Sequence, residues 1–498
     1  MVDALNARGH LTLICLVGIL LQPIVASADD DWGDDGDDIG FADTPDIDVK
    51  SQGLSENLKL KMLARSRAGF WLERLEKDAV STLRQSLDLD GLYKQEQWRL
   101  VLGAHLEYDP AYVFDAGRYD AATRDVYTWR YLPREQYLAG QFGIFDLAFG
   151  KQVAVWGVGD VFSPLDLINP RDLREPGLAD LDDIRLPLLM TRIGAVTPVG
   201  RFELIVAHEA YYGEQSTPLG EYSPFRALLK REPAIASFLG DRSIEYAHLQ
   251  SGYRLQASQV FGRWSHNGTG YDLGLYAAWA RDRQGVLRLP SEFGQLGDLL
   301  ATGLDPSTLP GIPNSFKLDL DHRRFVAVGS SLSTVFGSFV LKSELILALD
   351  QPYNSGDAEA VIPVIQVDET TMLTGMAGLT YSGFRDTVVG LEVQRTVGLG
   401  EAPSALFPIT ALQSALRVSR TFFNEDMRLD AAATAVGVQA QYGWLARAEL
   451  AYVLQDNLQL GMMYVHYGEG DRAEVGPFYG LDQHDQLWLK LRWAVQLI

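Results

Sequence analysis

The residues of this 498-residue chain that are best suited to binding chemistry lie between Gly150 and Pro187. Two carboxylates, an amide and two guanidinium groups fall within nine positions of this segment, at Asp166, Asn169, Arg171, Asp172 and Arg174. Side chains of these types bind polar and charged groups through charge-assisted hydrogen bonds. We therefore take this segment as the first candidate for a functional site.

Catalysis has weaker support in the sequence. His208 with Glu209, and His322 with Asp319 and Asp321, are the groups that acid–base chemistry would use. A nucleophile also needs a base within hydrogen-bond reach and a third group that orients that base. Neither G-x-S-x-G nor H-E-x-x-H occurs, and one cysteine with eight scattered histidines shows no metal-ligand spacing. The sequence thus predicts no enzyme, no metal site and no cofactor.

The elements that must position these residues follow a period of two. From residue 58 onward, apolar residues such as Leu58, Leu60 and Met62 alternate with polar ones such as Lys59 and Lys61. This alternation is typical of a strand with one apolar and one polar face. The alternating segments are about 10–14 residues long, whereas strands of a soluble sandwich average about 5–6. The length favours strands that cross a membrane.

Short turns and long polar loops alternate along the chain, which is the layout of an outer-membrane barrel. Such a barrel pairs every backbone amide and turns its apolar face outward. The sequence therefore predicts an all-β fold, a transmembrane antiparallel β-barrel of about 18 strands. Sixteen is the alternative, because the pairing of 58–72 with 80–92 is the weakest part of the pattern. Aromatic residues at the expected strand ends, such as Trp71, Tyr108, Trp156 and Tyr467, are predicted to form interfacial girdles.

The same alternation predicts which side chains line the lumen. On the pore wall we expect a set of arginines: Arg65, Arg67, Arg99, Arg201, Arg254 and Arg417. Rings of basic residues favour anions in a pore. Pairing with glutamates across neighbouring strands would instead only neutralise these charges. The sequence leaves both interpretations open.

Loop 157–187 is expected to fold into this lumen as a constriction. Prolines at 164, 170, 176 and 187 exclude regular structure, and leucines mixed with charges suit a segment that packs against other residues. Wall side chains alone do not fill a barrel of 16–18 strands. The alternative is an ordered extracellular cap without a role in transport.

The N-terminal region precedes the barrel. Residues 1–28 have the pattern of a cleaved signal peptide, with a short apolar core and Ala26-Ser27-Ala28 before the cleavage point. Residues 29–57 are predicted to be an acidic flexible tail, since residues 29–48 hold ten aspartates. The barrel is expected to span 58–498. Lys plus Arg number 43 and Asp plus Glu 65, a formal net charge of −22, which argues against a nucleic-acid partner.

The segment GKQVAVWGVGD, followed by PLDLINPRDLREP, resembles a signature of poorly characterised proteobacterial outer-membrane barrel proteins that are porin-like. In that signature a G-[KR]-Q-x-x-x-W-G strand end leads into a D-x-x-N-P-x-D-L loop. The matching positions are Gly150, Lys151, Gln152, Trp156, Gly157, Asp166, Asn169, Pro170, Asp172 and Leu173. The resemblance implies a barrel in the outer membrane of a Gram-negative cell, with relatives associated with exporter systems or with uptake of hydrophobic compounds. One departure is the C-terminal Gln496-Leu497-Ile498, where such barrels usually end on an aromatic residue.

The sequence as a whole predicts an outer-membrane channel or transport protein for small or amphipathic solutes, as a part of an export or uptake system. The alternative is a surface-binding or structural barrel without a conducting pore. The expected partners are outer-membrane lipid, a small-molecule solute and a periplasmic transport partner that binds the acidic tail.

Overall fold

The structure is a computed structural model that describes residues 57–115, 117–179, 181–223, 225, 242–253, 257–288, 315–356, 365–400, 405, 409–471 and 476–497. The predicted signal peptide, the acidic tail up to residue 56 and Arg254 lie outside the described residues.

Long antiparallel strands form a closed barrel. The sheet contains nineteen strands among the described residues, of which β2 (Val80–Thr82) is a short addition to β1. The other eighteen form the ring, and β1 closes it by pairing with β24 from Lys61↔Gln496 to Trp71↔Gln486. In chain order these are β1 (Leu58–Trp71), β3 (Gln85–Gln95), β4 (Trp98–Tyr108), β5 (Trp129–Phe142), β6 (Phe145–Gln152), β8 (Leu188–Thr197), β9 (Gly200–Ala207), β12 (Gln259–Gly268), β13 (Tyr271–Arg281), β16 (Arg324–Phe336), β17 (Phe339–Ser355), β18 (Gln366–Phe384), β19 (Thr387–Leu399), β20 (Gln413–Phe422), β21 (Met427–Val436), β22 (Trp444–Gln455), β23 (Leu458–Gly468) and β24 (Gln486–Gln496).

The eighteen-strand count predicted from the sequence is confirmed, including the first hairpin. β1 pairs with β3 from Leu58↔Tyr93 to Ser66↔Gln85, so the alternative of sixteen strands is wrong. The boundaries differ in places. The strand expected at 80–92 is divided into β2 at Val80–Thr82 and β3 from Gln85 onward.

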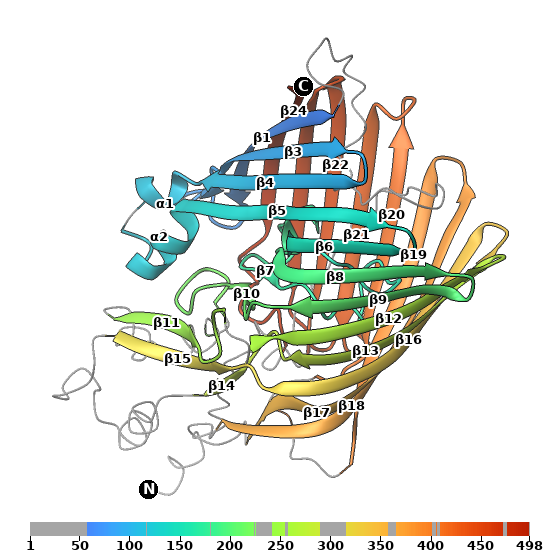
Figure 1. Ribbon diagram of the computed structural model, residues 1–498. Coiled ribbons are helices and arrows are strands. Elements are labelled where there is room, and N and C mark those ends of the chain that lie inside the picture. Colours follow the sequence, from blue (N-terminus) through green and yellow to red (C-terminus); the bar gives the residue numbers. More distant parts are fainter. Residues whose placement is uncertain are drawn as a thin grey trace, which may run out of the picture.

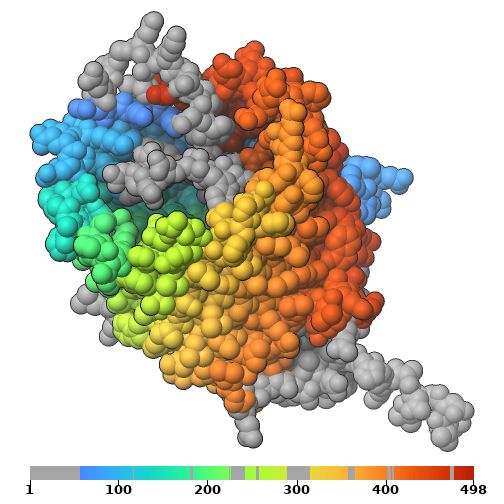
Figure 2. Space-filling view, turned by 90° about the vertical axis from the view of Figure 1, so that its right-hand side faces the viewer, coloured from blue at the N-terminus to red at the C-terminus, as the bar shows by residue number. Residues whose placement is uncertain are grey.

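The two ends of the barrel differ. Eight short turns lie at one end, at the right in Figure 1, while the helices α1 (Ala111–Phe114) and α2 (Ala121–Thr128) belong to a long connection at the other. Figure 2 looks onto the short-turn end, where the colours run around the wall in chain order. Gly143 and Gly337 occupy two of these turns with φ of +62° and +60°, a backbone conformation that glycine adopts without steric cost.

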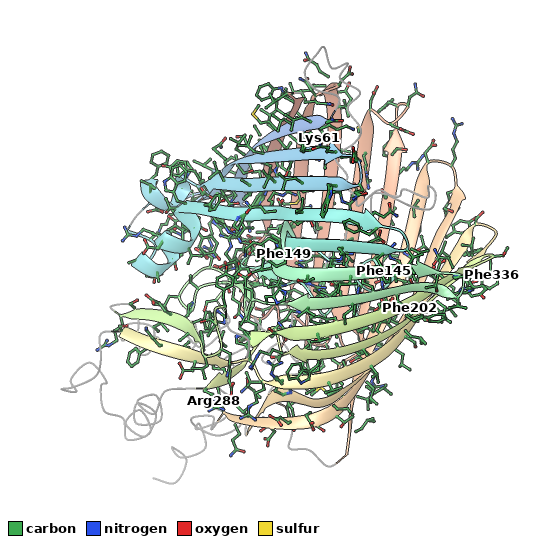
Figure 3. All side chains as sticks on the ribbon, viewed as in Figure 1. Lys61, Phe145, Phe149, Phe202, Arg288 and Phe336 are labelled. Carbon is green, nitrogen blue, oxygen red and sulfur yellow. The ribbon has the colours of Figure 1, made fainter. Side chains whose placement is uncertain are left out.

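The outer face of the ring is apolar. Large side chains that are more than a third exposed repeat along the strands, such as Leu102 and Leu106 on β4 and Leu345 and Leu349 on β17. Figure 3 labels Phe145 and Phe149 on β6 and Phe202 on β9, which belong to the same set. A soluble barrel would hide these groups from water, so this exposed band fits a wall that contacts lipid.

The aromatic girdle predicted at the strand ends is wrong in part. Trp71, Trp156 and Tyr467 are 2%, 1% and 2% exposed and pack in clusters with loop residues such as Leu178 and Leu165. Tyr108 and Trp129 do face outward, and their rings contact each other at a tilt of 34° with centroids 4.5 Å apart. An aromatic residue at a strand end serves equally well in a lipid interface or in an interior cluster, and only strand parity separates the two.

The remaining strands and a short helix lie in the connections between ring strands. β11 (Ser243–His248), β15 (Ser315–Asp321) and β14 (Val286–Arg288) form a three-stranded sheet. β7 (Arg171–Leu173) pairs in parallel with β10 (Gly213–Gln215), and α3 spans Leu181–Ile184. Among the described helices, each is too short or too polar to cross a membrane.

Candidate functional site

The candidate site is the connection between β6 and β8, residues 153–187, which we call the inner loop. It leaves one sector of the wall and returns to the neighbouring strand. Between these points, hydrogen bonds and ion pairs join it to β1, β5, β17, β19, β22 and β23. In the order of strands around the ring, β19 lies almost opposite β6 and β8. The inner loop therefore crosses the lumen and contacts several sides of the wall.

Two carboxylates on the far wall accept hydrogen bonds from the first part of the inner loop. Glu344 of β17 accepts the backbone N–H groups of Val158, Gly159 and Leu165 at 2.6, 2.9 and 3.0 Å. Glu392 of β19 accepts three more, described further below. Glu344 and Glu392 are the sixth residues of their strands, counted from the short turns, so the inner loop reaches into the half of the barrel nearer that end.

Asn169 ties the start of the inner loop to its end. Its side-chain oxygen accepts the N–H of Ala154 at 2.7 Å, and its amide nitrogen donates to the carbonyl oxygens of Gln152 and Leu186 at 3.0 and 2.9 Å. The side chain is fully buried. All of its strong hydrogen-bonding directions but one are thus used to hold the backbone of the loop.

Asp166 is the centre of a second group of hydrogen bonds that holds the inner loop. Arg171 and Arg185 donate to the same carboxylate oxygen at 2.6 and 3.0 Å, and Arg283 donates to the backbone carbonyls of Asp166 and Asn169. Burial alone would raise the pKa of Asp166, but the neighbouring guanidinium groups outweigh it and lower the pKa below its usual value. The carboxylate is therefore ionised at neutral pH.

The later part of the inner loop lies against basic residues of the N-terminal wall. Arg130 of β5 donates to Asp172 at 2.6 Å. Arg84 donates to Glu175, and Asp183 accepts Arg65 of β1 at 2.6 Å. Each of the three loop carboxylates is thus paired with an arginine from outside the loop. Burial opposes ionisation of Asp172 and of Asp183, yet these guanidinium groups lower the pKa of both.

Arg174 points from the loop toward the same wall. Its guanidinium group holds Asp172 at 2.9 and 3.0 Å and reaches Glu107 of β4 at 3.5 Å. Its side chain is almost fully buried. Arg174 therefore adds a positive charge between Glu107 and Asp172, beside those of Arg84 and Arg130.

Apolar packing completes the contacts. Leu165 and Ile168 pack with Trp156 and wall residues of β8, β9, β12, β13 and β16 in one cluster. Leu178 packs with Trp71 and wall residues of β21–β24 in another. On that side, the hydroxyl of Tyr467 donates to the carbonyl of Pro176 at 2.6 Å and Arg447 donates to that of Ala179 at 3.0 Å.

The predicted wall arginines occupy different places. Arg65 and Arg67 contact the inner loop through Asp183, at 2.6 and 3.4 Å. Arg99 and Arg201 stand beside the short turns at the other end of the wall, where Arg201 pairs with Asp146 at 3.1 Å. Arg417 of β20 lies 4.0 Å from Asp430 on the neighbouring strand. The structure therefore brings two of the five described wall arginines to the loop.

Several residues that hold the inner loop were not predicted as site residues. They are Glu344, Glu392, Arg84, Arg130, Arg447 and Tyr467. The alternation of apolar and polar residues along β17 and β19 does place Glu344 and Glu392 on the inward, polar face. Which of the inward charges meets the loop depends on the closure of the ring, and no local pattern encodes that closure.

The two histidines considered for catalysis form hydrogen bonds with neighbouring residues of the barrel and its connections. His208 bonds to Thr191 at 2.8 Å, and His322 bonds to His248 and to a backbone carbonyl. Within the part of the chain that the structure describes, there is no group of three or more His, Cys, Asp or Glu side chains arranged to hold a metal ion.

Fold and site together define a transmembrane β-barrel whose lumen is crossed by an anchored loop. A family model described as a protein of unknown function (DUF1302) matches residues 75–200, about a quarter of the chain. That stretch includes Gly150–Leu173, the segment that carries the signature. No curated protein matches the chain.

Solved structures of similar layout include outer-membrane proteins of two bacteria, Acinetobacter baumannii and Pseudomonas aeruginosa, whose matches are as follows. Acinetobacter baumannii OccAB1 is 9% identical, with a TM-score of 0.49, and the match covers 90% of this chain and 99% of that one. Pseudomonas aeruginosa OccK8 (OprE) is 10% identical with a TM-score of 0.48, covering 90% and 100%. Pseudomonas aeruginosa OpdK with vanillate is 10% identical with a TM-score of 0.44, covering 89% and 100%.

Proposed function

We propose that the protein is an outer-membrane channel that passes small solutes through a lumen narrowed by the inner loop. A closed ring of eighteen strands with an apolar outer face suits insertion in a bilayer. A ring of that size encloses more space than wall side chains fill. The observation that carries the proposal is the bonding of one loop to opposite sides of the wall, from Glu392 on β19 to Arg130 on β5.

The constriction residues in this proposal are those of the inner loop, Asp166, Asn169, Arg171, Asp172 and Arg174. Asp166, Asn169 and Asp172 fix the shape of the loop through the contacts described above. The apolar clusters around Leu165 and Leu178 are buried and hold the inner loop against the wall. Passage of small or amphipathic solutes past the loop is part of the proposal.

Deletion of residues 160–180 tests this role. Single-channel conductance of the deletion variant in a planar bilayer should exceed that of the intact protein, because the segment that crosses the lumen is gone. The matched control replaces the exposed turn Arg385-Asp386 with Asn-Gly, which should leave conductance unchanged since both side chains are largely exposed. Equal conductance of the deletion variant and the intact protein would contradict a constricting loop.

A role within an export or uptake system is the second part of the proposal. The acidic tail at residues 29–57 would bind a basic surface on a periplasmic partner by charge attraction. Removal of the tail should then reduce transport in cells while single-channel conductance stays the same. Transport that is intact without the tail would count against such a partner.

A barrel without a conducting pore is the second candidate function, and the density of bonds around the inner loop favours it. In that case the long loops at the outer end would bind at the surface. A correctly folded barrel that stays silent in bilayers, with and without residues 160–180, would support this candidate.

A further inference from the structure

The turn at residues 158–165 presents a row of backbone N–H groups to two wall carboxylates. Glu392 accepts the N–H groups of Asp160, Val161 and Phe162 at 2.6, 2.9 and 2.7 Å. With the three that Glu344 accepts, six backbone N–H groups converge on two side chains. Five of the six are consecutive, from residue 158 to residue 162.

The hydroxyl of Ser163 is a seventh donor, whose one proton is shared between the two oxygens of Glu344, at 3.1 and 3.2 Å, and the carbonyl oxygen of Trp156, at 3.1 Å. Both glutamates are nearly inaccessible, at 2% and 4% exposed. Unpaired carboxylates in such a place would be costly, so these donors account for their burial.

The backbone of the turn is shaped for this purpose. A side chain at Gly157 would lie 2.0 Å from the hydroxyl oxygen of Ser163 and 2.5 Å from Glu344, and the φ of Gly157 is +95°. A side chain at Gly159 would lie 1.9 Å from the carbonyl oxygen of Phe162. Glycine at both positions lets the chain curl until successive N–H groups point the same way. Concavities of this kind bind anions.

We propose that residues 158–165 form a binding site for carboxylate groups, which we call the amide nest, and that Glu344 and Glu392 are the positioning residues that occupy it. The two wall side chains then determine where the inner loop lies in the lumen. The effect on channel width rests on the proposed function, whereas the binding of a carboxylate to the amide nest does not.

Charge matters as well as shape. At the amide nest, the turn and the wall are also joined by a salt bridge, in which Lys342 of β17 donates to Asp160 at 2.5 Å. The remaining bonds join neutral N–H groups to anions. A glutamine in place of either glutamate would offer one oxygen and turn an NH₂ group toward the N–H donors. The proposal therefore predicts that small carboxylates, but not chloride, refill the nest when a glutamate side chain is removed.

The test uses the full barrel in detergent with one reporter cysteine. Val161→Cys places a thiol at a residue that is 9% exposed and packs with Phe162, Met376 and Ala415, and Cys15, the chain's own cysteine, is replaced by serine. The rate of maleimide labelling then reports how often the turn leaves the wall, without reference to conductance. Glu392→Ala and Glu344→Ala are compared with Asp430→Ala, a wall carboxylate that pairs with Arg428 on its own strand.

Each glutamate variant should label about tenfold faster or more than the intact wall in sodium chloride. Replacing chloride with acetate at the same ionic strength should bring the rate back toward that of the intact protein. Asp430→Ala should label slowly in both salts. Conductance in the glutamate variants should follow the same pattern, with more open-channel noise in chloride than in acetate.

Three results would overturn the inference while leaving the proposed channel untouched. These are slow labelling in both glutamate variants, fast labelling that acetate does not reverse, and equal acceleration in Asp430→Ala. A retained heat-modifiable gel mobility shows that each variant is folded. If labelling and rescue behave as predicted but no protein conducts, the amide nest stands and the channel function fails.

Discussion

Arg84, in the link between β2 and β3, holds Glu175 of the inner loop with two parallel hydrogen bonds of 2.7 Å each. Both side chains are buried, at 4% and 8% exposed. Two-pronged pairs of this kind fix orientation as well as distance. This pair therefore ties the inner loop to the N-terminal wall at a point far from the amide nest.

Breaking that pair should be costly. Arg84→Gln leaves Glu175 charged, buried and without its partner, so we expect a loss of about 3–5 kcal/mol in the free energy of unfolding. Denaturant unfolding in detergent measures it. The double variant Arg84→Leu, Glu175→Leu should lose less than Arg84→Gln alone. Both variants take the guanidinium group away from Glu107 and Asp109, each 3.6 Å from it, but only the single variant also leaves Glu175 charged without its partner. Asp386→Asn, from an exposed pair with Arg385, is the control and should change nothing measurable. A single variant as stable as the intact protein would refute the role of the pair.

Asn169 offers a test of hydrogen-bond direction. Asn169→Ala removes three bonds to buried backbone groups and should destabilise the barrel by about 2–4 kcal/mol, at roughly 1 kcal/mol per bond. Asn169→Asp should be worse, because a carboxylate cannot donate to the carbonyl oxygens of Gln152 and Leu186. The exposed Asn267→Ala is the control. The same denaturant midpoints decide the order, and an aspartate variant milder than the alanine variant would contradict the assignment.

Gly159 should not tolerate a methyl group. In Gly159→Ala the new carbon would lie 1.9 Å from a backbone oxygen and 2.7 Å from Met376, so the turn must shift and lose bonds to the glutamates. We expect a loss of about 1–3 kcal/mol and faster labelling of Val161→Cys. Gly262→Ala in β12 meets nothing within 4 Å and serves as the matched control. Equal stability of the two alanine variants would mean that the curl of the turn is not required.

A buried histidine pair predicts a dependence on pH at the long-loop end. Nδ1 of His322 lies 2.8 Å from the backbone oxygen of Asp282, which can only accept, so Nδ1 carries a proton there. Nε2 of His322 therefore accepts from Nδ1 of His248 at 2.8 Å, and the bond requires a neutral His322. Burial lowers the pKa of His322 to about 3. Its contribution to stability is complete above its ordinary value of about 6.5 and is lost as pH falls toward 3.

Asp282 acts in the opposite direction. Burial raises the pKa of its carboxyl to about 6, so the ionised form costs stability, and that cost disappears as pH falls from about 6 toward the ordinary value of about 4. Each group changes stability by about 1.4 kcal/mol per pH unit within its window, with opposite signs between pH 6 and pH 4. The contributions of these two groups should therefore nearly cancel there.

The variant Asp282→Asn should reveal the contribution of His322 to the pH dependence of stability. Its denaturant midpoint should fall more steeply between pH 6 and pH 4 than that of the intact protein. His322→Asn in the same background should remove the slope again. A flat profile in Asp282→Asn would contradict the neutral state of His322.

The strands of the barrel wall can be predicted from the sequence, but the contacts of the loop inside the barrel cannot. Alternation of apolar and polar residues reports directly on the two faces of a strand, so all eighteen strands of the ring could be predicted. The composition of residues 157–187 also indicated a packed loop. Its partners could not be predicted, because Glu344 and Arg65 come together with the loop only when a ring of distant strands has closed. Trp71 and Trp156 were placed in a girdle for a similar reason, since their inward partners come from the loop.

Single-channel recording of the refolded mature barrel in a planar bilayer under a salt gradient tests the central claim most directly. The account predicts steady open channels, with a reversal potential shifted toward anions if the inward arginines such as Arg99 and Arg201 dominate the path. A correctly folded barrel that never conducts would contradict the claim that the lumen is an open, constricted channel.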